Sequence, residues 1–242
     1  MIFIYRISNN SYNVPRFSNA TKEHCFINFL ENLFFQERDF LYIIADDVSD
    51  GLRSFLSSHL PFQSEMLDVH TGSNAASFRL QLQIAADIPD GEIVFLHEDD
   101  YLYKPHEADS RKFKFNNFLV LEGLKRSDYV SLYDHHDKYL IPTPEGQSKV
   151  SFTGLDDAKV FLTSASHWKY TDSTTLTFAV RSEILKQDME TWSNHAKGDH
   201  PNDFQAFLEL NQKGRLIATP IPGRATHADP VFFSPFTDWS KV

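Results

Sequence analysis

The chain has 242 residues, with 23 basic and 33 acidic side chains, which gives a formal net charge of −10. Hydrophobic residues make up 41% and charged residues 23% of it, with nine Gly and eleven Pro, a composition that excludes collagen-like, mucin-like and largely disordered chains. The acidic balance argues against a nucleic-acid polymer as partner, because that binding relies on basic side chains that displace counterions from phosphates. A small phosphorylated ligand stays possible, because one metal ion inverts the local field.

The N-terminal half alternates predicted strands and helices. Apolar runs predict strands at 1–7, 40–45, 65–70 and 93–96, and helical periodicity predicts helices at 21–35, 51–59 and 73–86. Ser73 or Asn74 would cap the third helix. This alternation predicts an α/β fold with a mostly parallel central sheet flanked by helices.

The C-terminal half is less regular. Helices are predicted at 113–124, 182–192 and 203–210, and strands at 129–133, 159–164 and 174–180. Residues 219–242 are rich in Pro, aromatic and turn residues, which predicts a tail wrapped over the surface. Because the sequence contains no clear linker or repeat, residues 1–242 are interpreted as one domain.

The single cysteine, Cys25, can neither form an internal disulfide nor supply a zinc knuckle. Its apolar setting predicts a packed thiol rather than a nucleophile. The apolar start of the chain is too short for the core of a signal peptide, and no apolar run is long enough to span a membrane. These features predict a cytoplasmic protein.

Polar residues follow three of the predicted strands at their carboxyl ends: Arg6, Asp46-Asp47 and Glu98-Asp99-Asp100. Ligands of parallel α/β sheets bind at this edge, so we expect the three clusters to converge on one site. Three successive carboxylates oppose one another's ionisation. A divalent cation such as Mg²⁺ or Mn²⁺ would relieve that repulsion, and a solvated acidic turn is the alternative.

Other candidate residues have weaker signals. Asp46 could bind a nucleobase or ribose, or its neighbourhood could cap the next helix. Arg79 and Arg224 could each bind phosphate, although a surface role is the default for Arg79. His227 could ligate a metal. Asp199 and Asp203 precede a predicted helix, where an Asp is either a helix cap or a general base for an alcohol.

An ordered set of short motifs, spread over nearly the whole chain, resembles small GT-A glycosyltransferases, specifically a viral and bacterial set that includes a chlorovirus rhamnosyltransferase domain. The motifs are Tyr5-Arg6-Ile7-Ser8 with Tyr12, Ile44-Ala45-Asp46-Asp47, Phe95, Glu98-Asp99-Asp100-Tyr101, Leu132-Tyr133-Asp134-His135, Asp137-Lys138-Tyr139, His167-Trp168, Ser173-Thr174-Thr175, Thr177-Phe178-Ala179, Pro222-Gly223, Thr226-His227, Ser234-Pro235-Phe236 and Asp238-Trp239.

The resemblance implies a GT-A fold that binds a nucleotide-diphosphate sugar, with Mn²⁺ or Mg²⁺ bridging the diphosphate. Residues 1–102 would bind the donor and residues 103–242 the acceptor, a glycan or another hydroxyl compound. The implied metal ligands are Asp99, Asp100 and His227. The family's usual pattern has Asp at the position of His97, which leaves the register of the ligands open by one residue.

The other site residues implied by the resemblance bind the donor or act on the acceptor. The donor-binding residues would be Arg6, Asp46, Asp47, Asn74, Arg79, Glu98, Asp99 and Arg224. Asp203, with Asp199 as the second candidate, would be the general base of an inverting transfer. A nucleotidyltransferase on a similar sheet and a non-catalytic carbohydrate-binding module are the alternatives.

Overall fold

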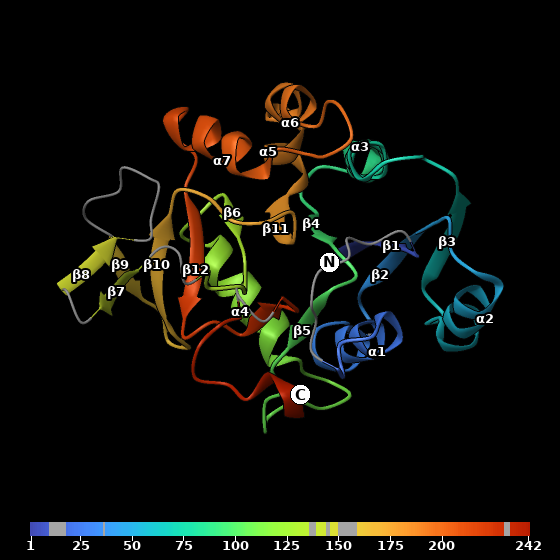
Figure 1. Cartoon of the computed structure of the whole chain (residues 1–242), viewed down its shortest axis with the longest axis horizontal. Coiled ribbons are helices and arrows are strands. Elements are labelled where there is room, and N and C mark those ends of the chain that lie inside the picture. Colours follow the sequence, from blue (N-terminus) through green and yellow to red (C-terminus); the bar gives the residue numbers. More distant parts are fainter. Residues whose placement is uncertain (10–17, 36, 136–138, 144–145, 150–158, 230–232) are drawn as a thin grey trace.

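The computed structural model describes residues 1–9, 18–35, 37–135, 139–143, 146–149, 159–229 and 233–242. A nine-stranded sheet with the order β3-β2-β1-β4-β11-β6-β12-β10-β9 runs through the molecule (Figure 1). The motif residues Tyr12, Asp137 and Lys138 lie outside the described residues.

The N-terminal part of the sheet is parallel. It consists of β1 (Ile2–Ser8), β2 (Phe40–Asp46), β3 (Ser64–Val69) and β4 (Ile93–His97). Strand β1 pairs in parallel with both β2 and β4. The connecting helices are α1 (Lys22–Asn32), α2 (Asp50–His59) and α3 (Asn74–Asp87). Each element predicted in this half is confirmed to within a few residues, and Ser73 is the cap of α3.

Side chains of β1 alternate between two hydrophobic cores, as the pleat of a strand requires. Phe3 and Tyr5 pack in the core that contains residues of α1, α2 and α4 (Phe115–Leu124). Ile4 packs in the core on the opposite face. That core contains residues of α3, α5 (Ser182–Gln187), α6 (Met189–His195) and α7 (Asp203–Gln212). Helices therefore cover both faces of the sheet (Figure 1).

The rest of the main sheet is mixed. It contains β6 (Tyr129–Val130), β9 (Val160–Leu162), β10 (His167–Thr171), β11 (Phe178–Arg181) and β12 (Ile217–Ile221). Strand β11 runs antiparallel to β4, and β12 runs parallel to β6. Two further pairs lie outside it: β5 (Tyr101–Tyr103) with β13 (Ala225–His227), and β7 (Leu140–Thr143) with β8 (Gly146–Lys149).

The helix predicted at 182–192 is two helices, because the chain breaks at Asp188. The carboxylate of Asp188 accepts hydrogen bonds from the Tyr129 hydroxyl at 2.7 Å and from Nε of Arg215 at 2.8 Å. These long-range bonds anchor the break between α5 and α6.

The prediction of a surface tail after residue 219 is wrong. Strand β12 lies inside the main sheet, and β13 pairs with β5. Trp239, in a 3-10 helix at Trp239–Lys241, is buried against Cys25 and Leu102. Cys25 is confirmed as a buried thiol. Among the described residues, no helix combines the length and apolarity needed to cross a bilayer.

Candidate functional site

A pocket of about 500 Å³ opens at the carboxyl ends of β1, β2 and β4 and beside the N-terminus of α3. The three polar clusters predicted to converge do so here. The pocket is lined by Arg6, Ile7, Ser8, Lys22, Asp46, Asp47, Gly72, Ser73, Asn74, Ser77, Glu98, Asp99, Asp100, Asp199, His200 and His227.

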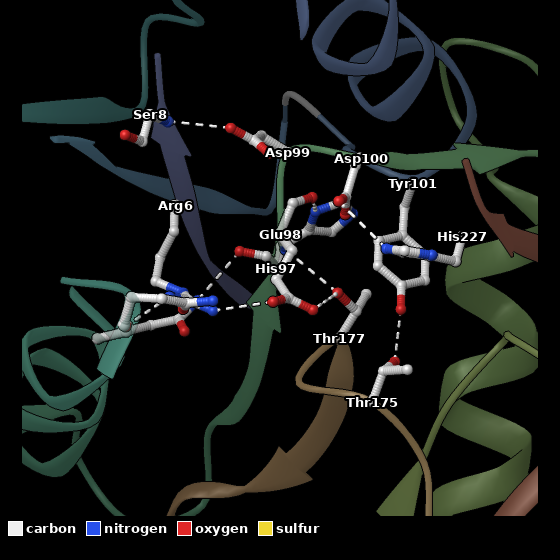
Figure 2. A network of polar contacts seen from close by, with 12 residues as sticks. Arg6, Ser8, His97, Glu98, Asp99, Asp100, Tyr101, Thr175, Thr177 and His227 are labelled. Carbon is white, nitrogen blue, oxygen red and sulfur yellow. Dashed lines mark hydrogen bonds and ion pairs between the residues drawn. The ribbon is translucent and has the colours of Figure 1, made fainter. Parts of the chain in front are cut away.

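Arg6 lines this pocket and joins two of the segments around it. One guanidinium nitrogen donates to the Oδ1 of Asn74 at 2.7 Å, and the other donates to Oε1 of Glu98 at 3.0 Å. Figure 2 shows the guanidinium directed toward the carboxylate of Glu98. Because Asn74 is the first residue of α3, Arg6 fixes the start of that helix against the acidic cluster after β4.

Glu98 is held by both polar and charged groups. Its backbone N–H donates to the Thr177 hydroxyl, which in turn lies 3.4 Å from Oε2 of Glu98. Burial raises the pKa of Glu98 to about 7, with the charge of Arg6 opposing this rise and that of Asp100 adding to it. Glu98 therefore anchors the acidic cluster to the body of the sheet.

Asp99 points away from Glu98 toward the ends of β1 and α1. Its Oδ2 accepts a hydrogen bond from the Ser8 backbone N–H at 2.9 Å and forms an ion pair with Lys22. The carboxylate is thus compensated by one backbone dipole and one positive charge.

The side chains of Asp100 and His227 point toward one another (Figure 2), and both residues line the pocket. The His227 Nε2 lies 3.2 Å from Oδ2 of Asp100. The antiparallel register of β5 and β13 places His227 opposite Tyr101, the residue after Asp100. A carboxylate and an imidazole from segments that are distant in sequence are thereby held on one wall.

His97 is not among the residues that line the pocket. Its side chain is fully buried, with Nδ1 donating to the Glu98 carbonyl and Nε2 accepting from the Tyr103 hydroxyl, each at 2.7 Å. Burial lowers the pKa of His97 to about 3, so the ring is neutral. The polar residues that face the pocket after β4 therefore begin at Glu98.

Asp46 and Asp47 line another side of the pocket. Asp46 accepts hydrogen bonds from the backbone N–H of Thr71, at 2.8 Å, and from the hydroxyl of the same residue. Asp47 is paired with His70. Both carboxylates thus hold the segment that follows β3, which also contributes Gly72 to the lining.

Two predicted donor-binding arginines lie outside this pocket. Arg79 donates to the carbonyl of Ala196 at 2.5 Å, just after the end of α6. Arg224 donates to Oδ1 of Asn116 at 3.1 Å and to the Lys104 carbonyl at 2.9 Å. The positions of both arginines indicate structural roles, because their guanidinium groups hold other parts of the chain together.

The two candidate bases occupy different positions. Asp199 lines the pocket, and its carbonyl accepts from the Ala75 backbone N–H at 3.0 Å. Asp203 is not among the lining residues. Burial raises its pKa, against the lowering effect of backbone hydrogen bonds and of the charges on His135 and His227. Asp203 is thus close enough to His227 to be influenced by its charge.

Sequence reasoning missed Lys22 and His200, both of which line the pocket. Lys22 resembles an ordinary solvated lysine in the first turn of a helix, and His200 is one of eleven histidines without metal-site spacing. Lys22 is brought to the site as the first residue of α1, and His200 by the loop between α6 and α7, positions that local sequence does not mark.

The pocket wall that carries Glu98, Asp99, Asp100 and His227 is better suited to a metal ion bound together with a substrate than to one bound by protein side chains alone. Within the described ranges, no group of three or more His, Cys, Asp or Glu side chains is arranged to hold a metal ion. Asp100 and His227 supply two adjacent donors on the pocket wall. Mg²⁺ is usually bound by one or two carboxylates together with substrate phosphates, a pattern that suits Asp100, whereas the imidazole of His227 favours a transition-type ion.

No family model and no curated protein matches this sequence. Solved structures, in contrast, are similar to this protein. The chain superimposes over 93% of its length on GalNAc-T7 with UDP, GalNAc and Mn²⁺, with a TM-score of 0.61 and 10% identity, and spans 42% of that chain. A synthase of 4-diphosphocytidyl-2C-methyl-D-erythritol from Anaerococcus prevotii matches over 99% of this chain and 93% of its own, with a TM-score of 0.51 and 12% identity.

A weaker similarity links 96% of the chain to 60% of the S. aureus TarS 1-349 structure, with a TM-score of 0.47 and 12% identity. The first two similarities confirm the predicted fold class: a GT-A-like α/β fold shared by glycosyltransferases and a nucleotidyltransferase. The narrower resemblance to the chlorovirus rhamnosyltransferase set stays a prediction.

Proposed function

We propose that this protein is a metal-dependent glycosyltransferase that moves a sugar from a nucleotide-diphosphate sugar to a hydroxyl group of a glycan or other acceptor. The observation that carries the proposal is the pocket at the strand ends, where Glu98, Asp99, Asp100 and His227 meet Arg6 on a GT-A-like fold. Ligands of such sheets bind at this edge.

The metal, Mn²⁺ or Mg²⁺, would be held by Asp100 and His227, with Asp99 beside them. Bound there, it would stabilise the negative charge of the diphosphate leaving group. The residues of the chain have separate tasks. Arg6 and Asn74 would shape the donor side, and Asp46 and Asp47 would hold the segment against which the nucleoside lies.

The general base would be Asp203, with Asp199 as the second candidate. A raised pKa makes Asp203 a better proton acceptor than an ordinary Asp, and His227 lies within its electrostatic reach. Asp199 has the advantage of lining the pocket directly. The base would take the proton of the acceptor hydroxyl as that oxygen attacks the anomeric carbon from the face opposite the leaving group.

Replacing Asp203 with Asn tests this assignment. Turnover is expected to fall by roughly 10²–10⁴-fold, the range typical of a lost general base, while donor affinity measured by calorimetry stays near that of the wild type. Asp199→Asn is the matched variant. If the large loss of turnover occurs in Asp199→Asn instead, the base is Asp199; if it occurs in neither, the inverting mechanism with an Asp base is wrong.

The proposed activity itself is tested with a panel of nucleotide sugars, first by thermal shift with and without Mn²⁺ and then by product analysis. Sugar transfer releases a nucleoside diphosphate. A chelator should abolish formation of the product and weaken the thermal shift, because the metal stabilises the diphosphate leaving group and adds to donor binding.

Nucleotidyl transfer is the second candidate, favoured by the similarity to the Anaerococcus prevotii synthase, which spans nearly all of both chains. It uses a related acidic edge but releases pyrophosphate from a nucleoside triphosphate. A non-catalytic carbohydrate-binding module is the third candidate, and binding of a glycan without any nucleotide binding would support it.

Under the proposal, residues 1–102 contribute most of the donor site, and residues 103–242 contribute the acceptor side together with His227 and Asp199. The stretch 142–170, where we predict acceptor contacts, lies partly outside the described residues. A cytoplasmic location and a single domain over 1–242 belong to the same proposal.

A further inference from the structure

The pocket contains far more negative than positive side chains. Among the described residues, six acidic side chains line it, those of Asp46, Asp47, Glu98, Asp99, Asp100 and Asp199, against two permanent cations, Arg6 and Lys22. A diphosphate would be repelled by such a wall unless positive charge faced it directly. The positions of the two cations therefore decide where an anion can bind.

Arg6 is committed to neighbouring protein groups. Its two terminal nitrogens donate to Asn74 and Glu98, and its guanidinium lies 5.4 Å from the ring centre of Phe78. The side chain is also buried. These contacts leave Arg6 suited to shaping the pocket rather than to approaching a phosphate.

Lys22 is placed differently. It is the first residue of α1, lines the pocket and is paired with Asp99. Within the described residues, Asp99 is the acceptor that the Lys22 ammonium contacts. An ammonium group has three N–H donors, so two remain for a ligand in the pocket.

Asp99 is correspondingly less suited to bind a metal. The same oxygen, Oδ2, accepts from both the Ser8 N–H and Lys22. A divalent cation at that oxygen would have to displace the lysine. Asp100 lies beside His227 on the pocket wall, with its Oδ2 at 3.2 Å from Nε2 of the imidazole.

We propose that Lys22 is a diphosphate-binding residue of this pocket, and that Asp99 positions it rather than ligating the metal. The inference rests on the proposed function and deepens it. In this arrangement the diphosphate lies between a positive charge built into the protein, Lys22, and the cation that enters with it near Asp100 and His227. Part of the affinity for the diphosphate is then independent of the metal.

The test is calorimetry on the full chain with inorganic pyrophosphate, the common nucleoside diphosphates and the matching nucleosides, each in EDTA and in Mn²⁺. The variants are Lys22→Gln, which retains a hydrogen-bond donor for Asp99 but loses the charge, and Lys22→Arg, which keeps the charge. Lys125→Gln is the matched control, because Lys125 is an exposed lysine paired with Glu122 outside the pocket.

Charge-assisted hydrogen bonds typically contribute enough that Lys22→Gln should weaken binding of the diphosphates by about 10- to 100-fold, in EDTA as well as in Mn²⁺. Nucleoside affinity should be unchanged, and Lys22→Arg and Lys125→Gln should bind like the wild type. Diphosphate affinity of Lys22→Gln within about two-fold of the wild type would overturn the inference and leave the proposed function intact.

Two other results would also count against it. Loss of nucleoside binding together with diphosphate binding in Lys22→Gln would assign the lysine a structural role. If the wild type binds no nucleotide under either condition, the donor site itself is refuted and the role of Lys22 with it. Failure of the proposed function is therefore distinguishable from failure of the Lys22 assignment, because it is observed with the wild-type protein alone.

Discussion

Two Asp–Lys pairs in this molecule show how different surroundings give the same chemical groups different tasks. Asp134 and Lys169 lie 2.7 Å apart with side-chain exposures of only 3% and 4%, and the Tyr139 hydroxyl donates to Asp134 at 2.6 Å. Asp99 and Lys22 are more than three times as exposed, at 13% and 14%, and border the pocket.

The two pairs differ in how completely protein atoms enclose them. Around Lys169 the ring of Tyr139 covers the ammonium, with its centre 3.7 Å from Nζ, so the pair is sealed within the protein. Around Lys22 the pocket provides space, and further carboxylates face the same volume. A closed pair with balanced charge holds the fold together, whereas an open region with excess negative charge can accept a ligand that brings a cation.

The largest predicted effect on folding comes from breaking the closed pair. Lys169→Met would leave the Asp134 carboxylate buried without its partner, which typically costs about 3–5 kcal/mol in the free energy of unfolding. Urea denaturation monitored by circular dichroism measures this loss.

The double variant Lys169→Met with Asp134→Leu is the control for that experiment. Because it removes both charges, most of the stability should return. If Lys169→Met alone unfolds at the wild-type urea midpoint, the contrast between the closed and the open pair does not hold.

At the open pocket, the effect should fall on activity instead of folding. Asp100→Asn removes one of the two proposed metal ligands, and we expect Mn²⁺-dependent turnover to fall by about 100-fold. The free energy of unfolding should change by less than about 1 kcal/mol, because a like charge is removed from an acidic wall.

A titration of turnover against Mn²⁺ separates the possibilities for Asp100→Asn. Partial recovery at high Mn²⁺ would fit a weakened ligand set, whereas an unchanged Mn²⁺ titration curve would contradict the assignment of Asp100. Asp90→Asn, at an exposed ion pair with Lys186, serves as the control for loss of one carboxylate.

The smallest effect is expected at the surface, where Glu209 contacts Lys213 and His195. Hydrogen bonds from Lys213 and then His195 lower the pKa of Glu209 to about 2, from an ordinary value of 4.5. Because the folded-state pKa is depressed, the stabilisation is present above about pH 4.5 and is lost as the pH falls toward 2.

Glu209→Gln should therefore cost less than about 1 kcal/mol at neutral pH, as is usual for exposed pairs. The difference from the wild type should shrink with added salt and disappear near pH 2. Thermal unfolding across this pH range measures it, and a cost as large as that of Lys169→Met would show that burial is not what separates the pairs.

Prediction from sequence succeeded where structure is decided locally. Strands β1, β2 and β4 are apolar runs between helices with clear periodicity, so their order and the convergence of their polar ends follow from the pattern. Strand β12 contains Pro220, and its flanks are rich in turn residues. Its burial depends on neighbouring strands β6 and β10, which are distant in sequence.

Site residues, too, could be predicted only where local sequence determines their position. Arg6, at the end of a predicted strand, had a stronger signal in the sequence than Arg79 and Arg224, and of the three only Arg6 lines the pocket. Arg79 and Arg224 donate to carbonyl groups of other elements, contacts that tertiary packing creates. Lys22 was missed for the corresponding reason, since nothing near it in sequence shows that Asp99 lies within its reach.

The short ladder between β5 and β13 has a thermodynamic consequence. It connects the segment after Asp100 to the one that ends in His227, and the residues beyond it lead to Trp239, which packs against Cys25 of α1. A ligand that binds both Asp100 and His227 would stabilise the pairing of β5 with β13, because it binds only when the two strands are paired. Amide hydrogen exchange in the C-terminal segment should then slow when the pocket is filled, although the ligand touches only one end of it.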